Sequence, residues 1–169
     1  MISEKLQQAI NNQINREFFS EYLYLSMAGH CMAINMDGIA NHFMVQAQEE
    51  HQHALKFFNF VHDRGGRVTL EALDKPKSTF SNLAEVFEEA MAHEHMVSRA
   101  INELMDIGIK ENDHAVISFL KWFVDEQVEE ESTVSKLLHK IKLIGDDGHG
   151  LLMIDNELSQ KKFVAPPSA

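Results

Sequence analysis

Apolar residues recur with the 3.6-residue period of an α-helix through four long stretches of the chain. Breaks rich in Gly, Asn and Asp separate these stretches, at residues 35–38, 64–67, 108–113 and 145–148. Each stretch runs to roughly 25–32 residues without a proline, which is long for a helix of a globular protein. Four helices of similar length predict an all-α four-helix bundle.

The lengths of the connections predict how the helices are ordered in space. The first and third connections have only a few residues, so they join antiparallel neighbours. The second runs over about residues 65–81, contains Pro76, and is long enough to follow the whole bundle. We therefore expect one long crossover that leaves the second and third helices parallel, and a short fifth helix near residues 151–159. One domain over residues 1–160 and a tail over residues 161–169 complete this expectation.

Short polar residues mark the expected helix starts. Ser3 and Asn112 are expected to cap helices, because their side chains accept a hydrogen bond from a free backbone N–H. Asn82 followed by Glu85 has the spacing of a capping box, which predicts the start of the third helix.

Composition and charge narrow the class of protein. Lys and Arg number 15 against 26 Asp and Glu, a formal net charge of -11 with the His neutral. This balance argues against nucleic-acid or anionic-membrane partners, which need a basic patch, and favours cations. Cys31 is the single cysteine, so the chain has no disulfide framework. Neither a signal peptide nor an apolar run of the ~20 residues of a membrane span is visible, and we expect a cytoplasmic protein.

Each predicted helix carries polar residues at mid-length on an otherwise apolar face. Residues seven apart share a face of a bundle helix. These rows place acids, amides and an imidazole at matching depth: Glu17, Gln46, Glu50, His53, Glu94, Gln127 and Glu130. One such Glu is more often a residue at the rim of a face, but four at one depth are harder to explain in that way. Because unpaired buried carboxylates are costly and these faces hold no Lys or Arg, we predict that two divalent cations compensate the charge.

The spacing of the polar residues repeats between the two halves of the chain. Glu17 and Glu50 lie 33 positions apart, as do Glu94 and Gln127. The Glu50-x-x-His53 motif of the second helix is mirrored in the fourth, where Gln and Glu stand in place of Glu and His. Residues i and i+3 project to the same side of a helix, so each pair is able to hold one ion. We expect two unequal sites, and oxygen and imidazole ligands without thiolate favour iron or manganese.

At these motifs the sequence resembles the non-haem bacterial ferritins, over about residues 3–160. The resemblance is carried by Arg16-Glu17-Phe18-Phe19-Ser20-Glu21-Tyr22-Leu23-Tyr24, Glu49-Glu50-x-x-His53-Ala54, Glu94 and Glu126-Gln127-x-Glu129-Glu130. It implies the ferritin-like bundle with one long crossover and a short C-terminal fifth helix. It also implies an iron-storage cage of 24 identical subunits, which oxidises Fe(II) to Fe(III) with O2 at a diiron ferroxidase centre inside each subunit and deposits ferric mineral.

The resemblance also implies a role for each site residue. The first iron ion would be bound by three residues: Glu17, Glu50 and His53. The second would share a bridging carboxylate and add residues of the third and fourth helices: Glu50, Glu94, Gln127 and Glu130. A third iron site matches Glu49, Glu126 and Glu129, with Glu130 shared. Tyr24 matches the family's buried tyrosine, which hydrogen-bonds a ligand carboxylate beside the diiron pair.

Two departures separate the sequence from related families. Gln52 stands where bacterioferritins carry the Met that ligates haem, and the fourth helix lacks their Glu-x-x-His, so no haem is expected. The single cysteine excludes the rubredoxin-like module of rubrerythrins. The remaining histidines, including His42 and His93, show no ligand spacing, and we expect most of them at the surface.

Three other classes of function are compatible with four helices. A diiron oxygenase needs a cavity for an organic substrate, and the bulky Phe43, Phe57 and Phe123 around the acids leave little room for one. A DNA-protecting mini-ferritin of twelve subunits has its ligands between subunits, whereas here the four helices of one chain supply them. A purely structural bundle predicts that Fe(II) oxidation is unchanged when Glu50 or Glu94 is replaced by Ala.

Overall fold

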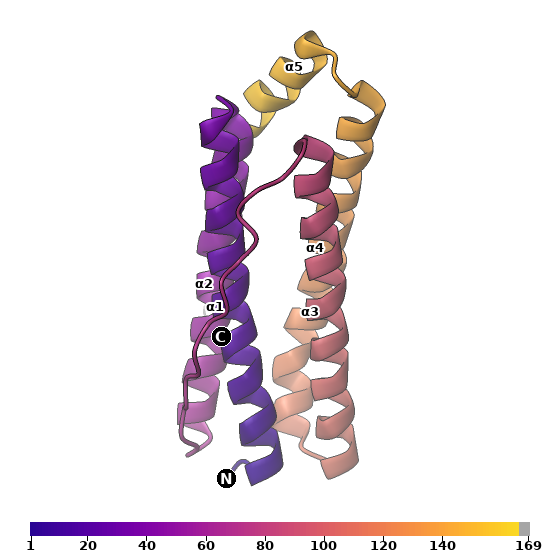
Figure 1. Cartoon of the computed structure of the whole chain (residues 1–169). Coiled ribbons are helices and arrows are strands. Elements are labelled where there is room, and N and C mark those ends of the chain that lie inside the picture. The colour runs from indigo at the N-terminus through magenta and orange to yellow at the C-terminus, as the bar shows by residue number, and fades with distance from the viewer. Residues whose placement is uncertain (166–169) are drawn as a thin grey trace.

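The computed structural model describes residues 1–165, and every regular element in that range is a helix. Four long helices lie side by side and a short fifth helix lies across one end of them (Figure 1). Their bounds are α1 Glu4–Ala33, α2 Asp37–Asp63, α3 Leu83–Glu111, α4 His114–Ile144 and α5 Gly148–Leu158. The predicted bundle with a long crossover and a short fifth helix is confirmed, with α5 starting slightly earlier than expected. The expected tail is described to residue 165, and residues 166–169 lie outside the described residues.

Short polar residues cap the helices, and one of them caps a different helix end from the one predicted. Ser3 starts α1 as expected, because its hydroxyl accepts a hydrogen bond of 3.1 Å from the Leu6 N–H. The expectation that Asn112 starts α4 is wrong. Asn112 ends α3 in the left-handed conformation, with a φ of 55°, and Asp113 caps α4 by accepting a 3.1 Å hydrogen bond from the Val116 N–H. Asn tolerates left-handed backbone better than most residues, which makes it a suitable helix end as well as a suitable start.

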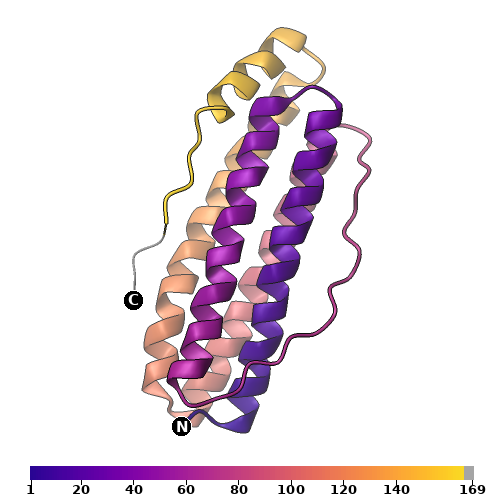
Figure 2. The same ribbon diagram turned by 90° about the vertical axis from the view of Figure 1, so that its left-hand side faces the viewer.

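The crossover of residues 64–82 runs the length of the bundle beside α1 (Figure 2). Four α1 side chains hydrogen-bond to its backbone at 2.8–3.4 Å: Gln7, Asn11, Asn15 and Ser26. At its end Asn82 caps α3 by accepting a 2.9 Å hydrogen bond from the Glu85 N–H, as the capping-box spacing predicts. The Glu85 carboxylate accepts from the Ser81 N–H, one residue before the expected donor. This path returns the chain to the end at which α2 began, so α2 and α3 are parallel.

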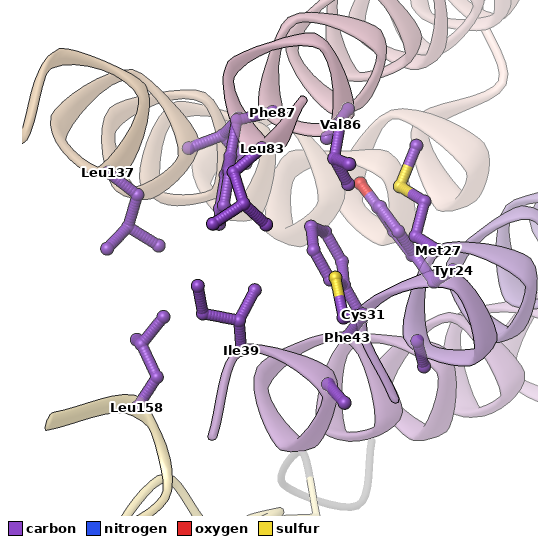
Figure 3. Close-up of a cluster of buried hydrophobic side chains, with 14 of the residues drawn as sticks. Tyr24, Met27, Cys31, Ile39, Phe43, Leu83, Val86, Phe87, Leu137 and Leu158 are labelled. Carbon is purple, nitrogen blue, oxygen red and sulfur yellow. The ribbon is translucent and has the colours of Figure 1, made fainter. Parts of the chain in front are cut away.

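The interior of the bundle consists of two hydrophobic clusters at different heights. One cluster, toward α5, contains Tyr24, Phe43 and Phe87 (Figure 3). The other, toward the start of α1, contains Ile14 and Phe57. Burial of these side chains is the main stabilising contribution, at roughly 25 cal/mol per Å² of apolar surface. The mid-length polar residues predicted from the sequence lie between the clusters, and we call this region the polar layer. None of the described helices has an apolar stretch of the kind a membrane crossing requires.

The fifth helix packs on the start of α2 at Gly38. A Cβ at this position would lie 1.7 Å from the backbone oxygen of Asp155 in α5, so only glycine allows this approach. The Asp155 carboxylate accepts a 2.9 Å hydrogen bond from the Ile39 N–H and thereby caps α2, whose own N-cap residue Met36 offers no side-chain acceptor. One turn further along α2, the Asn41 amide donates to three carbonyl oxygens of the following segment: Leu158, Ser159 and Lys161.

Replacing Gly38 by Ala is expected to dislodge α5. The added methyl group meets backbone rather than a flexible side chain, so α5 has to shift, at a cost of about 1–3 kcal/mol. Hydrogen exchange of the α5 amides should become faster and the thermal midpoint should fall. Gly29→Ala is the matched control, because a Cβ there has no neighbour within 4 Å, and it should leave α5 protected. Equal protection of α5 in both variants would contradict this role of Gly38.

Candidate metal centre

The residues predicted at mid-length are all buried in the polar layer. None is more than 7% exposed: Glu17 on α1, Glu50 and His53 on α2, Glu94 on α3, and Gln127 and Glu130 on α4. The seven-residue spacing keeps each of them on the inward face of its helix. Four carboxylates from four helices therefore meet inside one chain.

Glu17, Glu50 and His53 form a group that is able to hold a metal ion. One ligand atom of each lies within 4.8 Å of the others, and within residues 1–165 this is the one such trio of His, Cys, Asp or Glu. His53 Nδ1 and Glu50 Oε2 are 3.3 Å apart. Glu17 Oε1 accepts a 2.7 Å hydrogen bond from the Gln13 amide, whereas the buried Glu17 Oε2 has no hydrogen-bond partner among the described residues. A cation is a suitable partner for that oxygen.

Both oxygens of the Glu94 carboxylate are hydrogen-bonded. Oε1 accepts from the Tyr24 hydroxyl and Oε2 accepts from the Gln127 amide at 3.0 Å. The same amide lies 3.2 Å from the Ser98 hydroxyl. Tyr24 thus lies against a carboxylate of the predicted ligand set, where the resemblance places it. Within residues 1–165, Glu94 and Glu130 are not part of a second group of three metal-ligating side chains within ligand distance of one another. The side chains predicted to bind the second ion therefore lie in the polar layer, but they do not surround a common point.

The Glu130 carboxylate is held by two residues that link it to the surface of the bundle. The Gln46 amide donates a 2.7 Å hydrogen bond to Glu130 Oε2. On its other side the Gln46 oxygen accepts from the ammonium of Lys161, which also lies 3.4 Å from Glu49 Oε2. A cation thus approaches the buried acids from the segment after α5, whereas the helix faces that carry the acids were considered alone in the sequence.

The three residues of the predicted third site line the rim of the polar layer. Glu49 and Glu126 are half-buried and Glu129 is exposed. Burial raises the pKa of the Glu126 carboxyl, and the charges of Glu129 and Glu49 raise it further while His53 lowers it. These charges act on one another, so the acids lie near each other, although they form no closed trio.

Burial outweighs the nearby positive charges and shifts the pKa values of the buried acids upward. Desolvation raises the pKa of Glu17 and of Glu50 well above the usual value, and repulsion by neighbouring carboxylates adds to both shifts. Desolvation also raises the pKa of Glu94, opposed by the hydrogen bonds from Tyr24 and Gln127. The pKa of Glu130 rises to about 7, first through burial and then through repulsion by other acids. The layer as a whole favours added positive charge, from protons or from metal ions.

Most of the remaining histidines are exposed, as expected, but His42 and His93 are buried. His93 Nε2 lies 2.7 Å from the Ser20 hydroxyl, and its ring is edge-on to Tyr24. His42 packs among aromatic rings, and neither of its nitrogens has a hydrogen-bond partner within residues 1–165. Burial lowers the pKa of His42 to about 3 and of His93 to about 4, so both are neutral.

Comparison with known proteins gives consistent results. The sequence model of the ferritin-like domain matches residues 7–144. The bacterial non-heme ferritin of Staphylococcus aureus (strain USA300) is 39% identical over 163 residues, covering 96% of this chain and 98% of its own length. Among solved structures, a closed form of the Archaeoglobus fulgidus ferritin made by site-directed mutagenesis has a TM-score of 0.96 and 45% identity, covering 97% of this chain and all of its own. The open pore ferritin of that archaeon has a TM-score of 0.94 and 45% identity, over 96% of this chain.

The bundle with its crossover and the acids inside it define a ferritin-like protein, and the sequence match extends over nearly the whole chain. The chain belongs to the ferritin family, in the non-haem bacterial branch that its motifs predicted, and iron storage is its function.

Proposed function

We propose that each subunit oxidises Fe(II) with O2 at a diiron ferroxidase centre in the polar layer. The observation that carries the proposal is the meeting of four buried carboxylates and one imidazole from four helices, where Glu17 Oε2 has no hydrogen-bond partner in the described part of the chain. Hard oxygen donors with one imidazole and no thiolate suit iron. The raised pKa values of Glu17 and Glu50 identify groups whose charge a bound cation would stabilise.

The ligand roles follow the placement of the side chains. Glu17 and His53 would hold the first Fe(II) ion, and Glu50 would lie between it and the second. Glu94 and Glu130 would hold the second ion, with Gln127 as a neutral oxygen ligand or as the donor that fixes Glu94. Tyr24 orients the Glu94 carboxylate through its hydroxyl. Trp122 packs edge-on against the His53 ring, with 5.4 Å between ring centroids, and limits its rotation.

Two Fe(II) ions held side by side would give one electron each to O2, which takes up two protons and leaves as hydrogen peroxide, while both ions become Fe(III). Carboxylate oxygens favour Fe(III) over Fe(II), which makes the oxidation favourable. The Glu17, Glu50, Glu94 and Glu130 carboxylates accept or release protons as the iron ions arrive and leave, because each favours added positive charge.

Storage requires an enclosed space, and we propose that 24 copies of the chain form a cage. The family of the chain and its likeness to archaeal ferritins support this assembly. Residues 1–160 would form the ferritin domain of each subunit. The formal charge of -11 per chain would draw iron cations toward acids that face the interior, where Fe(III) hydrolyses and deposits as mineral. The rim acids Glu49, Glu126 and Glu129, together with Glu130, would form a third iron site on the path from the diiron centre.

Anomalous scattering at the iron edge tests the proposal directly. Crystals soaked aerobically with Fe(II) should show two peaks in the polar layer, one of them among Glu17, Glu50 and His53. Size-exclusion chromatography with light scattering should give a particle about twenty-four times the 19.3-kDa chain. A soaked crystal with no iron in the layer would refute the ferroxidase centre. A particle of one or two chains would refute the cage and favour a diiron oxygenase.

A further inference from the structure

The segment after α5 brings a positive charge to the rim of the polar layer. The Lys161 ammonium donates to the Gln46 oxygen and lies 3.4 Å from Glu49 Oε2. Gln46 in turn donates a 2.7 Å hydrogen bond to Glu130, so one side chain, that of Gln46, links the ammonium to a buried acid. The charge of Lys161 also lowers the pKa of Glu130, against the larger effect of burial. This cation therefore lies beside Glu49, one of the acids that we propose as the third iron site, and acts on Glu130, which that site shares.

The position of Lys161 is built into the fold. The Asn41 amide donates to the Lys161 carbonyl oxygen at 2.9 Å and to the Leu158 carbonyl oxygen at 3.1 Å. The Asp155 carboxylate and Gly38 fix α5 on the start of α2, as described above. From there the segment runs back along the bundle toward the level of the polar layer (Figure 2). The backbone is held at α5 and at Asn41, while the side chain that reaches the acids is long and flexible.

We propose that Lys161 is a tethered counter-ion of the third iron site, which an incoming metal ion must displace from Gln46 and Glu49. This inference rests on the proposed function and concerns only the regulation of its third site. An ammonium and a divalent cation compete for the same carboxylates, so the lysine weakens metal binding there. Lys161 and Glu49 have side chains 27% and 21% exposed, so water reaches the pair and the exchange needs no unfolding.

The consequence is an ordered filling of the centre. The trio of Glu17, Glu50 and His53 has no lysine within it and fills first. The third site opens only when the ammonium moves away, and the same ammonium returns when the ion leaves for the cavity. Lys161 is a positioning residue in this scheme: it contacts Glu49 of the site and takes no part in electron transfer.

The test is a calorimetric titration of the full-length, metal-free protein with Zn²⁺, which binds hard and borderline ligands without redox chemistry. Lys161→Met keeps the length of the side chain and removes its charge. We expect the third Zn²⁺ ion to bind about tenfold more tightly in this variant, the combined effect of one ion pair and one hydrogen bond at a partly exposed position. The affinity of the first ion, held by Glu17, Glu50 and His53, should not change. Asn41→Ala, which loosens the tether, should strengthen the third site by a smaller factor.

Lys162→Met is the matched control, because Lys162 is the next residue, carries the same charge and is exposed. It should bind all zinc ions as the wild type does. A general effect of removing a positive charge from an acidic protein would appear in both variants, whereas displacement of a specific counter-ion appears only in Lys161→Met.

A second measurement follows the lysine itself. In the wild type, acylation of Lys161 by an amine-reactive ester should be slower than that of Lys162 and should accelerate several-fold when more than two Zn²⁺ ions per chain are added. Equal third-site affinity in the two Met variants, or acylation of Lys161 that zinc does not change, would overturn the inference and leave the ferroxidase proposal standing. A wild type that binds no zinc tightly would overturn both.

Discussion

Replacing Glu50 by Gln is expected to slow aerobic Fe(II) oxidation by at least about 100-fold while leaving the metal-free protein folded. Glu50 is the carboxylate that interacts with all parts of the layer. It lies within ligand distance of Glu17 and His53, and its pKa is raised first by burial and then by the charges of Glu94 and Glu130. The amide keeps the shape of the side chain but removes the negative charge that would lie between two iron ions.

The same substitution should stabilise the metal-free bundle. A buried carboxylate repels its neighbours or must take up a proton, and an amide does neither. The thermal midpoint of the metal-free Glu50→Gln variant should therefore equal or exceed that of the wild type near neutral pH. Opposite changes in activity and stability are typical of a functional group that is costly to the fold.

The measurement is the initial rate of Fe(III) absorbance after Fe(II) is added in air, with circular dichroism for the melting curve. Glu103→Gln is the matched control, because Glu103 is an exposed carboxylate on α3 that should affect neither quantity. A wild-type oxidation rate in Glu50→Gln would show that the layer is structural and would refute the diiron centre.

The inward-facing residues could be predicted because burial in a bundle follows a local repeat. Glu17, Glu50, Glu94 and Glu130 share the seven-residue rows of apolar neighbours, and depth along a helix is set by counting residues. The pairing of helices then follows from the length of the crossover. The burial of these proposed ligands was therefore accessible from the sequence, whereas the contacts between helices that orient their side chains, such as that of Gln127 with Glu94, were not.

His93 shows where a helical repeat gives the wrong answer. As a neighbour of Glu94 it turns about 100° away from the layer, which suggests solvent. In the structure that direction points to α1, where His93 meets Ser20. A helix of a bundle has two helical neighbours and buries a wider face than a single row, so a residue beside an inward one can also be buried.

The position of Lys161 could not be predicted from the sequence, because it depends on how closely two backbone segments elsewhere in the chain approach each other. α5 reaches the start of α2 only because Gly38 has no side chain. The packing of α5 on α2 determines the path of the segment that follows α5. The hydrophobic periodicity of the sequence contains no information about this path. The acids of the layer were predictable, but the cation beside them required the tertiary structure.

The metal-free protein is expected to lose thermal stability as the pH rises from about 6.5 to 8. Glu130 has a pKa of about 7 in the native state, against an ordinary value of 4.5 in the unfolded chain. The stability that Glu130 contributes is complete at a pH below its pKa in the unfolded chain and is lost as the pH rises through its pKa in the native state. In this window the unfolded carboxyl is already deprotonated, and only the native carboxyl still holds a proton to release. Over this window Glu130 alone accounts for about 1 kcal/mol.

Two other buried acids act in the same direction, and two buried histidines act against it. Glu17 and Glu50 also have raised pKa values, so each adds to the loss of stability at higher pH. His42 and His93, with native pKa values of about 3 and 4, are neutral throughout the window, and in the unfolded chain histidine is mostly neutral above its usual 6.5. At the lower end of the window part of the unfolded histidine is still protonated, so the pair raises stability by about 1 kcal/mol as the pH rises and offsets Glu130. The net fall in stability therefore reports mainly Glu17 and Glu50.

Melting curves at fixed subunit concentration, with a chelator present, give the slope, and three comparisons identify its origin. Glu130→Gln should flatten the pH dependence by the contribution of that residue. The exposed-site variant Glu103→Gln should keep the full slope. Saturating Zn²⁺ should reverse the slope, because metal ions bind the deprotonated carboxylates that the metal-free protein disfavours. A metal-free wild type whose midpoint stays constant or rises between pH 6.5 and 8 would mean that the four acids are compensated without metal, and the electrostatic basis of the metal centre would be lost.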